Sequence, residues 1–403
     1  MRFKRSRKYD FFHHVSMETA PPLWHVGDGC ALDGVASTGI RKAAPMEQLS
    51  AQTRIVDGAI RSVMDRLRAE HGETEIDTGI ADQWEFRMHY GSLNATLDDG
   101  SVLIRVAAED ETCLSYMKMT VAGHFSEHLG TTKGIRWQGD GSDAGTPVFF
   151  REIRVVSATR ISPHMQRVRF SGSDLGRFAH GGLHVRLLLP PRGRQPVWPS
   201  MGADGLLVWP SGEDALVVRV YTIRALDAAG GWLDVDFVLH PGQDTPAATF
   251  AENAQAGDIV GMIGPGGGGT PDAETLLLVG DDTALPAIGR ILEELAPSTR
   301  AEVLIEVDGP EDRMSLADGE NIAVAWLYRQ GVEPGTAALL PAALRGRDRA
   351  VLPENLYVWA ACEFADFREI RKIVRKEWGL PRGRHLVTAY WRRGAESDDE
   401  GEE

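Results

Sequence analysis

The chain has 403 residues, of which 43% are hydrophobic, so it can build more than one ordinary core. Its formal charge of −15 at pH 7 argues against nucleic-acid binding, because a phosphate backbone attracts a basic surface. The three cysteines lie far apart, without metal-binding or disulfide spacing, which favours a reducing cytoplasm. No signal peptide and no apolar run of about 18 residues is found. The sequence therefore predicts a soluble, cytoplasmic protein with no membrane insertion.

The first part of the chain divides into a leader and a small domain. Residues 1–47 show neither helical nor strand periodicity and are expected to be irregular or disordered. Residues 48–140 predict an α+β domain of uncertain role: apolar residues from Ile55 to Leu67 recur at helical spacing, short strand patterns follow, and a second helix ends at Gly130. The turn-rich stretch 138–147 indicates a domain boundary.

The rest of the chain predicts two further domains. Closely spaced strand patterns with Gly and Pro turns fill residues 148–268, among them "LLVW" at 206–209, and predict an antiparallel β-barrel. Over residues 269–394, continuous apolar strands alternate with helices, as in a parallel α/β sheet. The last segment, 395–403, is an acidic tail that we expect to be disordered.

The stretch "RVYTIR", residues 219–224, is unusual for a strand that only fills a core. Val, Tyr, Thr and Ile favour an extended backbone, yet Arg219 and Arg224 stand at its two ends. Buried guanidinium groups must be paired, so the pattern indicates an anionic ligand. An edge strand whose arginines extend to solvent is the alternative interpretation.

Several ordered motifs carry a family resemblance. "RVYTIR" resembles the R-x-Y-T/S flavin motif of the ferredoxin-reductase superfamily. "DVDFVLH", "PAATFAENAQAGDIVGMIGPGG", "LLLVGDDTALPAIGRILEEL", "WAACE" and "GLPRGRHLVTAYWRRG" resemble, in order and spacing, the siderophore-interacting proteins. The resemblance covers about residues 148–394. It implies an FAD-binding barrel followed by an NAD(P)-binding-like domain of ferredoxin-reductase type.

The resemblance implies a role for each residue of the barrel site. The arginine of the motif binds the FAD pyrophosphate, for which a guanidinium is suited because it forks two donors onto phosphate oxygens. Thr222, near the flavin N5, is the expected catalytic residue. The expected FAD-binding residues are Arg219, Val220, Tyr221, Thr222, Asp236, Val238, His240, Pro246, Ala247, Ala248 and Thr249. Thr245, Ala248 and Phe250 depart from the family's Gly, Ser and Trp, so one phosphate hydrogen bond is in question, which Thr249 could replace.

The second half of the expected site lies in the α/β domain. Doubly wound sheets bind ligands beyond the carboxyl ends of their strands. The expected nicotinamide residues are Gly280, Asp281, Thr283, Ala284 and Glu363. A helix cap formed by Asp281 or Asp282, with Pro286 in the first turn, is the alternative. Cys362 is interpreted as a small buried residue rather than a redox group.

The substrate of the resembled family is a ferric siderophore, which is often anionic. Because the whole chain is acidic, attraction must come from a local basic patch. Arg186, Arg224, Arg392 and Arg393 are the expected substrate residues. No protein ligand for a metal is expected.

Three functions stay open at this stage. The first is an FAD-dependent ferric-siderophore reductase that uses NAD(P)H or ferredoxin as electron donor and releases iron(II). A general flavin or ferredoxin-type reductase is the second, because substrate specificity lies in loops. The third is a non-catalytic flavin- or siderophore-binding module. The sequence does not decide between NADH and NADPH: Arg313 favours NADPH, but Glu306, Asp308, Glu311 and Asp312 surround it.

Overall fold

The computed structural model describes residues 48–71, 74–88, 90–143, 145–239 and 245–394, and the chain forms two compact units. Unit 1 contains residues 48–150 together with 195–215. Unit 2 contains residues 151–194 and 216–394. Within the described ranges, no helix is both long and apolar enough to cross a membrane.

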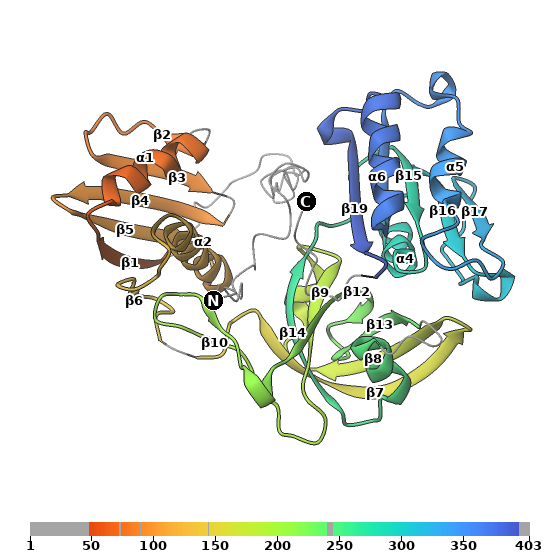
Figure 1. The fold of residues 1–403 in the computed structure, drawn as a ribbon, viewed down its shortest axis with the longest axis horizontal. Helices are drawn as coiled ribbons and strands as arrows, with labels where there is room; N and C mark the ends of the chain where they lie inside the picture. The colour runs from red at the N-terminus through yellow and green to blue at the C-terminus, as the bar shows by residue number, and fades with distance from the viewer. Residues whose placement is uncertain (1–47, 72–73, 89, 144, 240–244, 395–403) are drawn as a thin grey trace, which may run out of the picture. The chain divides into compact units, whose positions relative to one another are not determined.

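Unit 1 is an α+β domain. Its sheet, which Figure 1 shows together with α1 and α2, has the order β2-β3-β4-β5-β1-β6. Alternate residues of β4 are buried in the core that also contains residues of the two helices. Helix α2 is capped by Asp110 and ends at Gly130, which adopts the left-handed conformation that favours glycine. The elements are β1 (Leu49–Val56), α1 (Ile60–His71), β2 (Glu75–Ile76), β3 (Gln83–Met88), β4 (Gly91–Asp98), β5 (Ser101–Ala108), α2 (Glu111–Leu129) and β6 (Gln138–Gly139).

Two expectations for secondary structure were wrong. The apolar spacing predicted that Ile55 belongs to the first helix, but Ile55 lies in β1 and the helix begins at Ile60. The buried residues of the strand and of the helix happen to follow one another at helical spacing. "LLVW" is not a barrel strand: β11 (Leu207–Val208) pairs with β10 (Ser200–Met201), and this hairpin belongs to unit 1. There Trp137 donates its indole N–H to the Asp204 carbonyl at 2.9 Å.

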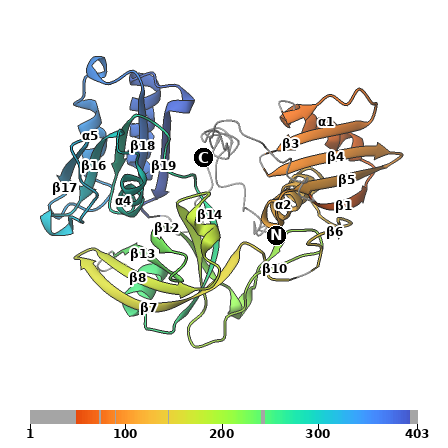
Figure 2. The ribbon, with the colours of Figure 1, turned by 180° about the vertical axis from the view of Figure 1, so that it is seen from behind.

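The first part of unit 2 is a closed six-stranded barrel, as predicted, with the strand order β12-β13-β8-β7-β14-β9 (Figure 2). Its interior is filled by apolar residues such as Phe170, Ile223 and Phe237. The elements are β7 (Phe150–Ser162), β8 (Met165–Gly172), β9 (His184–Leu189), β12 (Val217–Asp227), β13 (Trp232–Val238), α3 (Pro246–Asn253) and β14 (Ile259–Gly266).

The second part of unit 2 is a five-stranded parallel sheet with the order β17-β16-β15-β18-β19, which confirms the predicted α/β half. Leu276 and Leu278 face the core that contains α4, whereas Leu277 and Val279 face the core that contains α5 and α6, so β15 is buried on both faces. The elements are β15 (Thr275–Gly280), α4 (Leu285–Glu294), β16 (Arg300–Val307), β17 (Ile322–Tyr328), α5 (Leu339–Arg345), β18 (Leu356–Glu363), α6 (Phe364–Lys372) and β19 (His385–Trp391).

The strand order places a topological switch between β15 and β18. From β15 the chain continues to its neighbour β16, whereas from β18 it continues to β19 on the opposite side of the sheet. In open α/β sheets this is where ligands bind, outside the carboxyl ends of the strands.

Candidate flavin and nicotinamide site

The strand β12 carries the predicted flavin residues on two faces. Arg219 is half-buried and donates to the Val218 carbonyl at 2.7 Å through one terminal nitrogen. The Tyr221 ring packs 4.3 Å from the Phe237 ring, and burial raises the pKa of its hydroxyl, which therefore stays protonated. Val220 is 58% exposed, whereas Thr222 is 5% exposed. The strand therefore offers a cation and an immobilised aromatic ring two residues apart.

Helix α3 supplies the part expected to face the phosphates. Pro246 occupies its first turn, and its N-cap Thr245 makes no side-chain capping bond. The Ala247 and Ala248 methyl groups are buried in the barrel core, so these residues can offer a ligand only their backbone N–H groups. Arg192 donates to the Thr249 carbonyl at 3.2 Å. Sequence reasoning did not predict this arginine as part of the site.

These residues fit FAD. An uncapped helix N-terminus and a guanidinium are the two kinds of group that hold a pyrophosphate, and β12 together with α3 provides both. Val238, at the end of β13, packs partly on the core of the α/β half. His240 lies outside the described residues.

Two predicted ligand residues have a structural role instead. Asp236 is buried, and both of its carboxylate oxygens accept from Arg167 across the strand pair at 2.7 and 2.8 Å. Arg224 is 9% exposed and donates to both oxygens of Glu293 in α4, at 2.9 and 2.6 Å. Gly289 makes room for this guanidinium, since a Cβ there would lie 3.1 Å from its Nε. Arg224 therefore joins the barrel to α4, and its guanidinium is already paired inside the protein.

The predicted nicotinamide residues do come together at the switch point. Asp281 accepts from the Thr283 backbone and hydroxyl, from the Glu363 N–H at 3.0 Å and from the Trp391 indole at 2.8 Å. Glu363 accepts from the Ala365 and Arg393 backbone N–H groups. Both carboxylates are thus held in place by several hydrogen-bond donors inside the protein.

Close packing fixes the turn between β15 and α4. A Cβ on Gly280 would lie 2.4 Å from the Ala284 Cβ and 3.1 Å from the Ala361 carbonyl oxygen, so only glycine fits. Ala284 is fully buried and therefore shapes the turn rather than touching a ligand. Cys362 is also buried, and desolvation raises the pKa of its thiol well above the usual value, which makes it unreactive.

Sequence reasoning missed a buried arginine that contacts Asp282, the residue after Asp281. Arg329 contacts Asp282 at 2.7 Å and Glu306 at 3.7 Å. Burial raises the pKa of Asp282 to about 6 and that of Glu306 to about 7, against the opposing effect of Arg329. The signal in the sequence was the position of the two acidic residues: Asp282 follows the apolar strand β15, and Glu306 lies near the end of the apolar strand β16.

The remaining predicted substrate residues lie in two places. Arg186 is half-buried on β9, directly opposite Val220 on β12. Arg392 is exposed and lies 4.8 Å from the Phe364 ring, whereas Arg393 is exposed 3.6 Å from Glu333. Of the four predicted substrate arginines, Arg392 and Arg393 are the two with exposed side chains.

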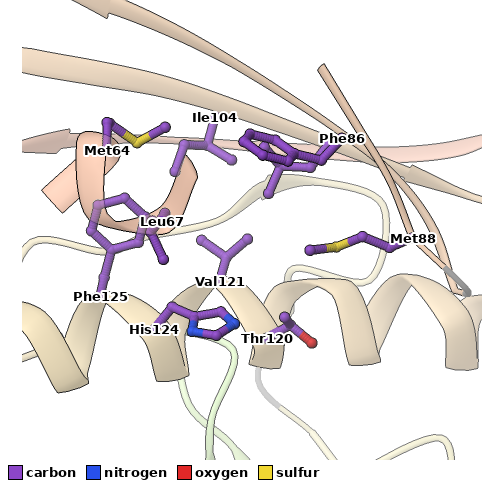
Figure 3. Close-up of a pocket in the computed structure, with 10 residues that line it drawn as sticks. Met64, Leu67, Phe86, Met88, Ile104, Thr120, Val121, His124 and Phe125 are labelled. Atoms are coloured by element: carbon purple, nitrogen blue, oxygen red, sulfur yellow. The ribbon is translucent and has the colours of Figure 1, made fainter. Parts of the chain in front are cut away.

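Unit 1 contains a small apolar cavity between its sheet and α2, shown in Figure 3. Its volume is about 30 Å³, well below the ~300 Å³ at which ligand pockets begin. The lining residues are Met64, Leu67, Phe86, Met88, Leu93, Ile104, Thr120, Val121, His124 and Phe125. We interpret it as imperfect packing rather than as a binding site.

The fold and the site define a class: an FAD-binding barrel joined to a parallel nucleotide-binding sheet. Residues 154–269 match the siderophore-interacting FAD-binding domain, and residues 273–394 match the siderophore-interacting protein domain. The chain belongs to the siderophore-interacting protein family, as its motifs predicted.

Known relatives cover the same part of the chain. Ferric vibriobactin reductase ViuB of Vibrio cholerae serotype O1 is 31% identical over 64% of this chain and 94% of its own. A siderophore utilization protein from T. fusca is 33% identical with a TM-score of 0.53, covering 64% of this chain and 99% of its own. The siderophore-interacting protein SipS from Aeromonas hydrophila is 27% identical with a TM-score of 0.51, covering 62% and 94%.

Proposed function

We propose that this chain is an FAD-dependent oxidoreductase that reduces ferric siderophores with electrons from NAD(P)H. Family membership supports the substrate class, and the matched FAD-binding domain supports the cofactor. The observation that carries the proposal is the position of β12. It bears Arg219, Tyr221 and Thr222, and the same strand is joined through Arg224 to α4, the helix that follows β15.

The chain's own residues bind and orient the reactants. When bound, FAD would supply the redox chemistry, which is hydride transfer from NAD(P)H and single-electron transfer to ferric ions. Arg219 and the first turn of α3 would neutralise the pyrophosphate, and Tyr221, held by Phe237, would support the isoalloxazine ring. Thr222, in the position that the family resemblance assigns beside N5, is almost completely shielded from water.

The substrate needs no protein ligand to its iron. Hard oxygen donors hold iron(II) less tightly than iron(III), so reduction alone releases it. The net charge of −15 would repel an anionic complex at long range, so attraction has to be local. Arg392 and Arg393 would supply it. Cytoplasmic action stays a prediction from the wide spacing of the cysteines in the sequence.

Unit 1 would add recognition or assembly rather than electron transfer. The cavity between its sheet and α2 is small and apolar. The buried Lys118 of α2 donates to the Gly141 carbonyl and the Ser142 hydroxyl, in the segment that follows β6. Burial lowers the pKa of Lys118 to about 8. Its ammonium therefore holds residues 140–142 in place.

The test begins with the purified protein and its absorption spectrum. We expect one FAD per chain, bleaching of the flavin under anaerobic NAD(P)H, and iron(II) formation from ferric hydroxamate, catecholate or citrate complexes, measured with an iron(II)-specific chelator. Replacing NAD(P)H with reduced ferredoxin distinguishes the other predicted donor. A flavin that binds but accepts electrons from neither donor would contradict the proposal and favour a binding module.

A further inference from the structure

The segment after β16 holds an arginine among four acidic residues. In doubly wound folds, the adenosine ribose lies at the end of the second parallel strand, where an acidic residue binds the 2′-hydroxyl of NADH or an arginine binds the 2′-phosphate of NADPH. Here that strand is β16, which is followed by Asp308, the short turn Pro310–Asp312 and Arg313. The tertiary contacts of these side chains decide which rule applies.

Two of the four carboxylates are buried inside the protein. Glu306 is 1% exposed and lies beside Arg329. Asp312 is 2% exposed, and its oxygens accept from the Ser162 hydroxyl at 3.1 Å and from the backbone and ring nitrogens of His164 at 3.0–3.2 Å. Neither carboxylate can reach a ribose at the surface.

The other two carboxylates lie against neighbouring backbone. One Asp308 oxygen accepts from the Gly331 N–H at 2.9 Å, and its carboxylate lies within 4.8 Å of the ligand atoms of His164 and Asp312. These three side chains do not require a metal ion, because Asp312 already has several protein donors. Glu311 is exposed, but its carboxylate folds back over Gly309, where a Cβ would lie 2.8 Å from Oε1.

Arg313 is the exposed cation of this segment. Its Nε donates to the Tyr328 hydroxyl, and its guanidinium carbon lies 5.2 Å from the centre of the Tyr328 ring at the end of β17. Among the described residues, no hydrogen bond occupies its two terminal nitrogens. An arginine fixed on an aromatic ring loses little freedom on binding and presents a planar pair of donors that matches a phosphate.

We propose that Arg313, supported by Tyr328, binds the 2′-phosphate of NADPH and makes this chain selective for NADPH over NADH. The inference rests on the proposed use of a nicotinamide donor. It identifies that donor and the residue that selects it.

A binding assay tests the inference without turnover. Calorimetric titration of the FAD-loaded full-length protein with 2′,5′-ADP and with 5′-ADP compares two ligands that differ in the 2′-phosphate. We expect 2′,5′-ADP to bind about tenfold more tightly or better, as a charge-assisted phosphate contact of about 1.4 kcal/mol or more would give. Arg313→Gln should abolish the preference and leave 5′-ADP affinity unchanged. Arg300→Gln, an exposed arginine at the opposite end of β16, is the matched control and should retain the preference.

A second variant separates orientation from charge. Tyr328→Phe keeps the ring but removes the hydroxyl that holds Nε, so the preference should fall without disappearing. Equal affinity of the wild-type protein for both ligands, or a preference that survives Arg313→Gln, would overturn the inference. Selective binding without reduction of any ferric siderophore would instead contradict the proposed function and leave the inference standing.

Discussion

His184 makes a sharp prediction about stability and pH. It begins β9, is nearly fully buried, and its Nε2 lies 2.7 Å from the Tyr390 hydroxyl. Packing is tight around the ring, since a Cβ on Gly267 would lie 2.5 Å from Nδ1. Desolvation, and to a lesser degree the charge of Arg290, lowers the pKa of His184 to about 4 from 6.5.

The direction of the effect follows from proton binding. Between pH 6.5 and 4 the unfolded chain binds a proton at His184 that the folded chain does not, so the free energy of unfolding falls as the pH is lowered through this window. Above pH 6.5 the imidazole is neutral in both states and costs nothing. The full loss, reached below the folded pKa, is about 3 kcal/mol, since one pKa unit corresponds to about 1.4 kcal/mol.

The assay is the urea midpoint of the FAD-loaded protein at pH values from 7.5 to 4.5. His184→Gln keeps an acceptor for the Tyr390 hydroxyl but cannot be protonated, so its midpoint should change less with pH than that of the wild-type protein. His180→Gln, at an exposed position in the same unit, should follow the wild-type curve. Parallel curves for wild type and His184→Gln would refute the reasoning.

Three further predictions concern cofactor, substrate and unit 1. Arg219→Ala should weaken FAD binding by about 1.5–3 kcal/mol, which is the contribution of charged hydrogen bonds. Flavin fluorescence measures the affinity, and Arg154→Ala, at an exposed position of the barrel, is the control. Replacing Arg392 and Arg393 together by Gln should raise KM for an anionic ferric siderophore, and less so at high salt because screening already weakens the attraction; an unchanged KM at low salt with FAD bound would remove them from the substrate patch. Deleting residues 1–140 exposes the β10–β11 hairpin, so a matched variant also replaces residues 195–215 by a short Gly-Ser link. We expect the linked variant to keep both FAD and reductase turnover, and complete loss of turnover with FAD bound would contradict the division of labour.

Local patterns were sufficient for most of the architecture. Strand periodicity, turn glycines and caps depend on residues close in sequence, and they predicted the α+β unit, the closed barrel and the parallel sheet. The nicotinamide residues could be predicted as a group because the carboxyl ends of parallel strands meet at one edge, which brings Asp281 and Glu363 together although 82 residues separate them.

Tertiary structure decided which charged side chains remain available to a ligand. The sequence presents Arg219 and Arg224 as equivalent ends of one strand, yet only Arg224 has a carboxylate partner 69 residues away that removes it from solvent. In the same way, Asp312 looks like a ribose ligand until His164, 148 residues earlier, is found against it, which leaves Arg313 as the exposed cation. The type of each residue is a local fact that the chain itself determines, whereas its desolvation and pairing depend on distant segments that only folding brings into contact.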